Sequence, residues 1–352
     1  MDNLYYNSKR LKNVYSSVYD PENLIRSQHN AQRGKSIRKE VIQFNEQISK
    51  RMIDIYDMLA NETYKPGKYR IKTIYEPKER IIMIAPFFPD RIIHHCIINV
   101  LGSFWAKIFI ENTYACVKGR GIHKCMEDLH RDLVTDRKGT KYCLKIDIKK
   151  FYDNIDHSSL KRIIRYRIAD NKMLWLLDAI IDSNGQEKGL PIGNFTSQYF
   201  ANLYLSYFDH WMKEDVRAKY YYRYMDDIVI LHESKDELHH ILDMMGLYLG
   251  AELKLEIKSN WQIFPVDSRS IDYVGFKQNH YGVLLRKSIL RRFYKKFEKT
   301  KRQYIISNED DFKHLFSSEY GWILRCTERH NRYILNKCLK DGNKCINYRT
   351  AG

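Results

Sequence analysis

YYYRYMDDIVIL spans residues 220–231 and decides the fold, because two apolar runs meet there at a pair of acids. Aromatic and β-branched residues on both sides predict two strands joined at Asp226 and Asp227. Adjacent carboxylates repel each other and resist burial, so an exposed hairpin turn is one interpretation of the pair. A cation site is the other interpretation, because a bound cation offsets the repulsion between the two carboxylates.

A third acid follows another short apolar run, KYCLKIDI (141–148), which predicts a buried strand. Asp147 at the end of this strand either caps the strand or acts together with Asp226 and Asp227. Three carboxylates at neighbouring strand ends can hold two Mg²⁺ ions, because Mg²⁺ prefers hard oxygen ligands and leaves room for phosphate oxygens. Two metal ions about 4 Å apart can clamp the attacking and leaving oxygens of a phosphoryl transfer.

Composition predicts a globular protein of two or three domains that attracts polyanions. The 352 residues include 60 Lys and Arg against 43 Asp and Glu, a net charge of +17, and 27 Tyr. Basic and aromatic residues together suit contact with a nucleic-acid backbone and stacking on its bases. An apolar content of 44% excludes a disordered chain, a collagen and a coiled-coil rod.

Targeting and redox signals predict a cytoplasmic protein without a membrane partner. No apolar run reaches the roughly 18 residues of a membrane helix, and the N-terminus lacks the apolar core of a secretory signal. The seven Cys residues form no CxxC pair, so we expect reduced thiols and neither a disulfide framework nor a zinc site.

Hydrophobic periodicity predicts an α+β fold with a helical C-terminal region. A charged turn at Glu76-Pro77-Lys78-Glu79 predicts a hairpin, and SIDYVGFKQNHYGVLLR (270–286) predicts a second one. A further strand is expected around 252–257. Helices are expected at 35–62, 90–111, 122–134, 158–168, 171–182, 194–216, 235–249 and from about 287 onward.

Several of these segments, in this order, resemble the conserved blocks of bacterial reverse transcriptases. RYMDDIVIL resembles the hairpin that carries the acid pair, and KIDIKKFYDNIDH (145–157) resembles the segment of the first acid. The other matching blocks are APFFPDRIIHHCI (85–97), YACVKGRGIH (114–123), GLPIGNFTSQYFANLYL (189–205) and DYVGF (272–276). The resemblance covers roughly residues 60–290.

The resemblance implies an RNA-directed DNA polymerase with a right-hand fold of fingers, palm and helical thumb, which makes cDNA from a template RNA and dNTPs. It implies the following boundaries: an N-terminal helical extension at 1–60, fingers at 61–140 (with 158–190 partly fingers and palm), a palm at 141–282 and a thumb at 283–352. It assigns two Mg²⁺ ions to Asp147, Asp226 and Asp227, with the backbone carbonyl of Ile148 as an additional ligand.

The resemblance also implies a nucleotide site. Tyr152 corresponds to the bulky residue that excludes a 2′-hydroxyl, although an ordinary core tyrosine is the alternative. Arg80 corresponds to the arginine that binds the triphosphate, and Lys258 to a lysine that can protonate pyrophosphate. Lys72 and Lys78 are weaker candidates for triphosphate contact, since solvent-facing lysines are common.

The segment GLPIGNFTSQ (189–198) departs from most reverse transcriptases, which carry Gln before the second Gly. Here Ile192 precedes Gly193, a pattern that resembles the enzymes of diversity-generating retroelements, which misincorporate opposite adenine. Isoleucine can only pack, whereas glutamine can hydrogen-bond near the nucleotide sugar, so Ile192 is expected to lower fidelity. The same resemblance implies a small basic accessory protein oligomer as a partner.

Residues 286–302 contain nine Lys and Arg against one Glu and predict a phosphate-binding face at the start of the thumb. A solvated helix face is the alternative. The candidate contacts with template RNA and the primer or cDNA strand are Arg286, Lys287, Arg291, Arg292 and Lys295. Two other functions stay open: a reverse transcriptase of anti-phage defence, and an inactive scaffold that only binds nucleic acid.

Overall fold

The computed structural model describes residues 10–75, 79–304, 306 and 308–343. The fold combines helices with antiparallel sheets, as expected of an α+β protein. The chain forms two compact units, each made of three segments. The first unit contains residues 1–118, 147–218 and 243–260, and the second contains residues 119–146, 219–242 and 261–352. Glu76, Pro77 and Lys78 at the tip of the first predicted hairpin lie outside the described residues.

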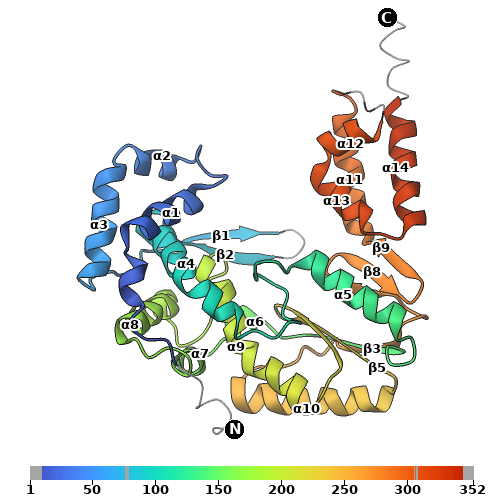
Figure 1. Ribbon diagram of the computed structural model, residues 1–352, viewed down its shortest axis with the longest axis horizontal. Helices are drawn as coiled ribbons and strands as arrows, with labels where there is room; N and C mark the ends of the chain where they lie inside the picture. The colour runs from blue at the N-terminus through green and yellow to red at the C-terminus, as the bar shows by residue number, and fades with distance from the viewer. Residues whose placement is uncertain (1–9, 76–78, 305, 307, 344–352) are drawn as a thin grey trace, which may run out of the picture. The chain divides into compact units, whose positions relative to one another are not determined.

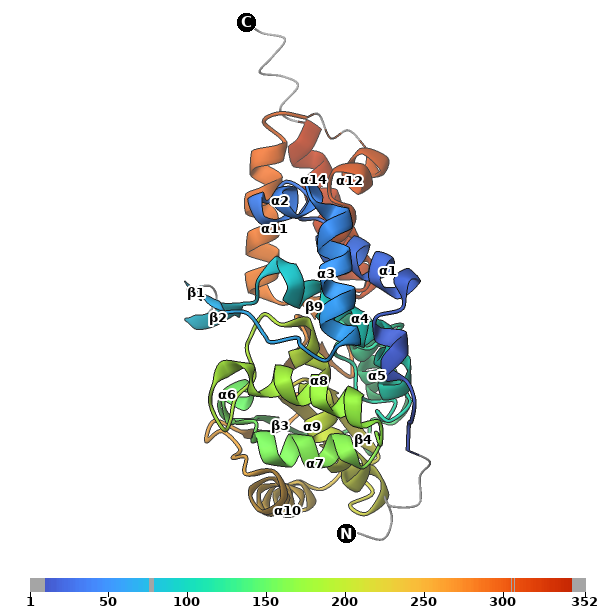
Figure 2. The ribbon, with the colours of Figure 1, turned by 90° about the vertical axis from the view of Figure 1, so that its left-hand side faces the viewer.

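The first unit is mainly helical and is organised around one apolar helix. Helix α4 (Ile92–Ala106) packs against α1 (Pro21–Gln32) and α9 (Phe195–Glu214), as Figure 1 shows. Helices α7 (His157–Arg165) and α8 (Asn171–Ile181) contact each other (Figure 2), and α7 also contacts α9. The remaining elements of this unit are η1 (Tyr15–Val18), α2 (Lys39–Asn45), α3 (Ile48–Ala60), β1 (Arg70–Ile74), β2 (Arg80–Ile84), η2 (Phe87–Arg91), α6 (Phe151–Asn154) and η3 (Asp182–Asn184).

The N-terminal helices differ from the prediction of one helix over 35–62, which was wrong. The chain leaves helical geometry at Gln47 (φ −129°, ψ 32°), so α2 and α3 are separate helices. Helix α1 was missed although its start carries a clear local signal. The side chain of Asp20 accepts hydrogen bonds from two backbone N–H groups of the first turn, and Pro21 occupies the first helical position.

The second unit contains a four-stranded sheet in the order β4-β5-β3-β6. Its strands are β3 (Tyr142–Asp147), β4 (Tyr220–Tyr224), β5 (Asp227–His232) and β6 (Gln262–Pro265), and α5 (Ile122–Thr135) contacts β4. The strand predicted at 252–257 was wrong. Helix α10 (Lys235–Leu253) extends into that range, and beyond the helix only Ile257 forms an isolated bridge, to Ile148.

A three-stranded sheet and four helices complete the second unit. The segment 270–286 forms β7 (Ile271–Tyr273), β8 (Phe276–Asn279) and β9 (Gly282–Leu285), and therefore two hairpins instead of the predicted one. Helices α11 (Lys287–Thr300), α12 (Glu309–Leu315), α13 (Ser317–Leu324) and α14 (Glu328–Asn343) stand next to β8 and β9 in Figure 1. One apolar core joins the strands to these helices, and its members include Phe276, Val283, Leu285, Phe293, Phe297, Phe312, Phe316 and Ile334.

None of the helices in the described part of the chain has the length and apolar content needed to cross a membrane.

Candidate active site

The acid pair lies at the tip of the β4–β5 hairpin, with Asp226 in the two-residue turn and Asp227 at the start of β5. Tyr224 and Asp227 are partners across the two strands, so Met225 and Asp226 form the turn itself. Met225 has a φ of 56°, the left-handed conformation that tight hairpin turns require and that non-glycine residues adopt at a cost. The guanidinium of Arg223 is fully buried and donates to the carbonyl of Met225 at 3.0 Å. The turn therefore rests on a buried cation that holds its backbone in place.

Two further side chains of the second unit hold Asp227. The hydroxyl of Tyr273, which is fully buried, donates to the carbonyls of Asp227 (3.1 Å) and Tyr222 (3.3 Å). The ammonium of Lys145 lies 3.6 Å from Asp227 Oδ1 and donates to the carbonyl of Asp272 at 2.5 Å. The hairpin is thus fixed to β7 through its backbone and to β3 through the carboxylate of Asp227.

Asp147 ends β3 and belongs to the first unit, where Lys258 is its neighbour. Lys258 Nζ lies 3.3 Å from Asp147 Oδ2, and the backbone N–H of Lys258 donates to the carbonyl of Asp147 at 2.9 Å. The bridge between Ile148 and Ile257 extends this contact along the chain. The structure therefore brings together Asp147 and Lys258, two of the residues singled out from the sequence.

No three His, Cys, Asp or Glu side chains within the described ranges form a ready-made cluster that could hold a metal ion. Instead, Asp147 and Asp227 each lie beside a lysine ammonium, at 3.3 and 3.6 Å. Carboxylate oxygens are hard ligands of the kind that Mg²⁺ prefers. The donor chemistry of these acids therefore fits a divalent cation.

The β1–β2 hairpin, predicted from the sequence and found in the structure, presents two of the candidate triphosphate ligands on one face. Lys72 is paired with Ile82, and Ile74 is paired with Arg80, so Lys72 and Arg80 point to the same side of the hairpin. Both side chains are exposed. A cationic face of this kind suits contact with phosphate oxygens.

Ile192 and Gly193 lie against the same hairpin. The backbone N–H of Met83 donates to the carbonyl of Ile192 at 3.0 Å. Gly193 has a φ of 129°, and a Cβ atom there would lie 2.8 Å from the carbonyl oxygen of Met83 and 3.2 Å from the side chain of Ile82. Only glycine allows this close approach. The structure therefore places Ile192 and Gly193 beside the hairpin that carries Lys72 and Arg80.

Tyr152 lies in the short helix α6 and is half-buried. Its ring packs edge-on against Phe151 with a centroid distance of 5.6 Å, and its carbonyl accepts from Leu190 N at 2.9 Å. The segment 189–193 is thus bonded to Tyr152 near one end and to Met83 near the other. All of these contacts lie within the first unit.

The basic face predicted at 286–302 lies on α11, in the second unit. Phe293 and Phe297 are buried, which turns the basic side chains outward. The exposed candidates are Lys287, Arg291, Arg292 and Lys295. Arg286 differs from them, because it is half-buried and its Nε lies 2.6 Å from Asp272 Oδ1.

Sequence reasoning missed four residues that hold these segments: Lys145, His157, Arg223 and Tyr273. Arg223 had a visible signal, because it is the one charged residue inside the apolar run YYYRY. The others lie in motifs that were recognised for different residues, and their partners are distant along the chain. Tyr273, for example, donates to Asp227, 46 residues away.

Comparison with known proteins identifies the family. Residues 68–278 match the family described as "Reverse transcriptase (RNA-dependent DNA polymerase)". The group II intron-encoded protein LtrA of Lactococcus lactis subsp. cremoris is 26% identical over 176 residues, which cover 47% of this chain and 28% of LtrA. The protein YkfC of Escherichia coli K12 is 25% identical over 172 residues, which cover 45% of this chain and 44% of YkfC. The matched region thus spans less than half the length of either relative.

The solved structures show the same fold. The telomerase from Candida tropicalis, in complex with a TWJ fragment of telomeric RNA, has a TM-score of 0.50 and 15% sequence identity, over 88% of this chain and 57% of the telomerase chain. At this identity the likeness concerns the fold alone. The family match covers more than half of the sequence, so the chain belongs to the reverse transcriptase (RNA-dependent DNA polymerase) family.

Proposed function

We propose that this chain is an RNA-directed DNA polymerase that copies a template RNA into cDNA, with Asp147, Asp226 and Asp227 as the metal-binding acids. The observation that carries the proposal is the tight turn at Met225 and Asp226, supported by buried Arg223, in a chain of this family. Asp147 ends β3 and Asp227 begins β5, and these strands are neighbours in one sheet. The grouping of the three acids rests on the family pattern that segments 145–157 and 223–231 resemble.

Reverse transcriptases use divalent metal ions, and we propose two Mg²⁺ ions held by the three carboxylates and the carbonyl of Ile148. When bound, such ions lower the pKa of the primer 3′-hydroxyl and neutralise charge on the triphosphate. We propose that the ammonium of Lys258 donates a proton to the departing pyrophosphate, and its distance of 3.3 Å from Asp147 Oδ2 supports this role.

The chain's own side chains select and orient the nucleotide in this proposal. Lys72 and Arg80, on one exposed face of the β1–β2 hairpin, bind the triphosphate through charge-assisted hydrogen bonds. Tyr152, half-buried beside the segment 189–193, excludes a ribose 2′-hydroxyl and so favours dNTPs. We propose that Ile192 also contacts the nucleotide, and the close approach of Gly193 to the β1–β2 hairpin supports this role.

The thumb binds the template–primer duplex in this proposal. The exposed cations on α11 contact phosphates without reading sequence, and Arg286 shares this role only in part because it also pairs with Asp272. We keep the expected division into an N-terminal extension (1–60), fingers (61–140, with 158–190 partly fingers and palm), palm (141–282) and thumb (283–352) as part of the proposal.

For the biological role we favour error-prone cDNA synthesis in a diversity-generating retroelement, with a small basic accessory protein oligomer as a partner. The supporting observation is Ile192, a half-buried apolar side chain in the segment that contacts the β1–β2 hairpin. An apolar residue there offers no side-chain hydrogen bond to hold a correct base pair in place.

The test is primer extension on an adenine-containing RNA template with Mg²⁺ and all four dNTPs, followed by sequencing of the products. Asp226→Asn with Asp227→Asn removes both charges at nearly constant volume, and Asp236→Asn with Asp243→Asn is a control of equal charge on α10. We expect extension by the wild type and the control, loss of extension in the first variant, and unchanged RNA binding in all three proteins. Extension that survives in the first variant overturns the assignment of the acids. Accurate copying at adenines favours the defence role over the retroelement.

A further inference from the structure

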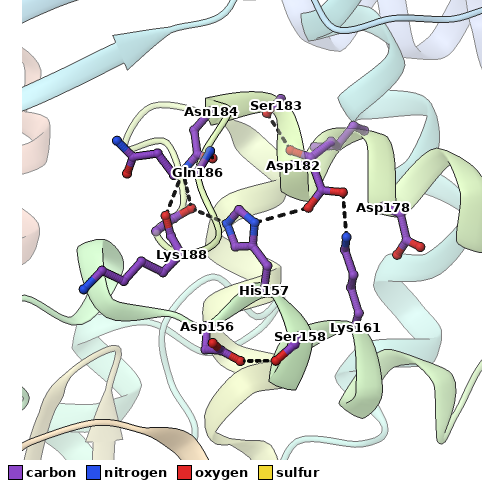
Figure 3. A network of polar contacts seen from close by, with 12 residues as sticks. Asp156, His157, Ser158, Lys161, Asp178, Asp182, Ser183, Asn184, Gln186 and Lys188 are labelled. Carbon is purple, nitrogen blue, oxygen red and sulfur yellow. Dashed lines mark hydrogen bonds and ion pairs between the residues drawn. The ribbon is translucent and has the colours of Figure 1, made fainter.

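His157 has a buried imidazole ring, and each ring nitrogen lies within hydrogen-bond distance of an acceptor oxygen. It is the first residue of α7 and is 4% exposed. Its Nε2 lies 2.8 Å from the carbonyl oxygen of Gly189, and its Nδ1 lies 3.2 Å from Asp182 Oδ1 (Figure 3). A carbonyl oxygen can only accept, so Nε2 carries the hydrogen of the shorter bond. The imidazole thus connects α7 to the start of the segment 189–193.

The carbonyl of Gly189 is held from two sides. Asn184 Nδ2 also donates to it, at 2.7 Å, so two side-chain donors converge on one oxygen. Asp182 is itself fixed by the ammonium of Lys161 at 2.6 Å (Figure 3). Gly189 has a φ of 88°, and a Cβ atom there would lie 3.2 Å from the carbonyl of Asp153. The side-chain donors of His157 and Asn184 therefore fix the orientation of this carbonyl.

The backbone on both sides of Gly189 is bonded to the segment that carries Tyr152. Gly189 N donates to Ile155 O at 2.8 Å, and Leu190 N donates to Tyr152 O at 2.9 Å. Farther along, the carbonyl of Ile192 accepts from Met83. A shift of the Gly189 carbonyl would consequently move residues 190–192. It would disturb the hydrogen bond between Leu190 and Tyr152 and move Ile192.

We propose that His157 is a positioning residue for nucleotide binding, acting through its Nε2–H bond to the carbonyl of Gly189. This inference rests on the proposed function, because it takes Tyr152 and Ile192 as residues that contact the incoming nucleotide. His157 does not touch the nucleotide. It holds the 189–193 segment in the position in which the backbone of this segment is bonded to Tyr152 and to Met83.

Two substitutions separate the two ring nitrogens. His157→Gln places an amide N–H2 near the position of Nε2 and keeps a donor toward Gly189. His157→Asn places its amide near the position of Nδ1, so it keeps the contact with Asp182 and loses the donor toward Gly189. Both variants bury a neutral amide of similar polarity, so each is the matched control of the other.

The measurement is single-nucleotide primer extension, which gives KM for the dNTP and kcat separately, with fluorescence anisotropy for template–primer affinity. We expect His157→Asn to raise KM about tenfold, the effect of one lost hydrogen bond, with kcat and template–primer affinity within about twofold of wild type. His157→Gln should keep KM within about threefold. Equal KM values in the two variants, or a fall in kcat alone, would overturn the proposal.

Two more measurements keep the proposal testable if His157→Asn folds poorly or the wild type lacks activity. Asn184→Asp replaces the second donor to the same carbonyl with an acceptor and should raise KM in the same direction as His157→Asn. Hydrogen exchange of the Leu190 amide, which donates to Tyr152, should be faster in His157→Asn than in His157→Gln. Unequal exchange without any nucleotide incorporation would contradict the polymerase proposal alone, whereas equal exchange would contradict the role of His157.

Discussion

Two acids of the candidate active site, Asp147 and Asp227, are each paired with a lysine. The Asp147–Lys258 and Asp227–Lys145 side chains are between 25% and 38% exposed, and ion pairs with this much solvent contact contribute about 1 kcal/mol or less to stability. These ion pairs therefore matter mainly because they position the two carboxylates and neutralise their negative charge. Ile192 belongs to the same scale, because it is an apolar side chain at a position where most reverse transcriptases carry glutamine.

Ile192→Gln is expected to lower the error frequency opposite template adenine by roughly five- to tenfold, because a restored side-chain hydrogen bond is worth about 1 kcal/mol in discrimination. Sequencing of the extension products measures this frequency. Ile192→Val is the matched control, since valine also lacks a hydrogen-bonding group and should keep the wild-type error spectrum. An unchanged spectrum in Ile192→Gln would contradict the role given to this position.

At the scale of elements, the β4–β5 hairpin depends on a strand from a different sheet. Tyr273 in β7 is fully buried and bonds to the carbonyls of Tyr222 in β4 and Asp227 in β5. Burial, and after it the charges of Cys125 and Asp227, raise the pKa of Tyr273 far above its usual value, so its hydroxyl stays protonated as a donor. The hairpin therefore takes its position from both sheets.

Tyr273→Phe should lower the free energy of unfolding by roughly 1 kcal/mol, because the carbonyls of Tyr222 and Asp227 lose their hydrogen bonds to this hydroxyl at nearly constant volume. It should also slow primer extension, since Asp227 loses its backbone anchor. Urea denaturation and extension assays check these two effects. Tyr281→Phe, at a side chain that is 69% exposed, is the control and should change neither quantity. Wild-type extension by Tyr273→Phe would show that the acid pair does not need this anchor.

At the scale of the whole molecule, the net charge of +17 is expected to favour nucleic-acid binding where basic side chains gather on an exposed face. Helix α11 provides such a face, because its phenylalanines are buried and its basic residues are exposed. The dependence of folding stability on acid pH is also a property of the whole molecule. It depends on buried groups that must become charged when the chain unfolds.

Replacing Lys287, Arg291, Arg292 and Lys295 by Gln should weaken binding of an RNA–DNA duplex and flatten its salt dependence by about one unit of logarithmic slope per lost phosphate contact. Anisotropy titrations at several KCl concentrations measure the slope. Replacing the exposed residues Lys12, Arg33, Lys39 and Lys50 of the first unit removes equal charge and should change the slope less. Equal effects of the two variants would mean that only bulk charge matters.

His94 makes the protein sensitive to acid. It is completely buried on α4, and burial, together with the charges of His95 and Arg91, lowers the pKa of His94 to about 3. In the unfolded chain His94 takes up a proton at about pH 6.5, whereas in the folded chain it stays neutral down to a much lower pH. The free energy of unfolding therefore falls as the pH drops from about 6.5 toward 3. His95 adds to this effect, because burial and nearby cations lower its pKa to about 4.

His94→Phe should therefore reduce the loss of unfolding free energy between about pH 7 and pH 4 by up to roughly 3 kcal/mol. Urea denaturation across this pH range provides the comparison. His29→Phe removes an exposed imidazole on α1 and should leave the pH dependence unchanged. Parallel pH curves for the wild type and His94→Phe would refute the assignment.

Much of the fold follows from local pattern. The strands around Asp226 and Asp227, the β1–β2 hairpin and the helices α4, α5 and α9 occur where alternation, helical periodicity and turn residues predict them. Local signals suffice there because each element buries the face that its own sequence makes apolar. The candidate acids and the candidate triphosphate ligands were proposed from their motifs alone.

The sequence by itself thus determined the family, the acid pair with its turn, and the apolar faces of most elements. The pairing of β3 with β6 and the partners of His157 and Tyr273 depend on the folded chain. The physical reason is sequence separation. These contacts join residues from 25 to more than 100 positions apart, and the pattern within one segment does not show which distant donor or strand will contact it.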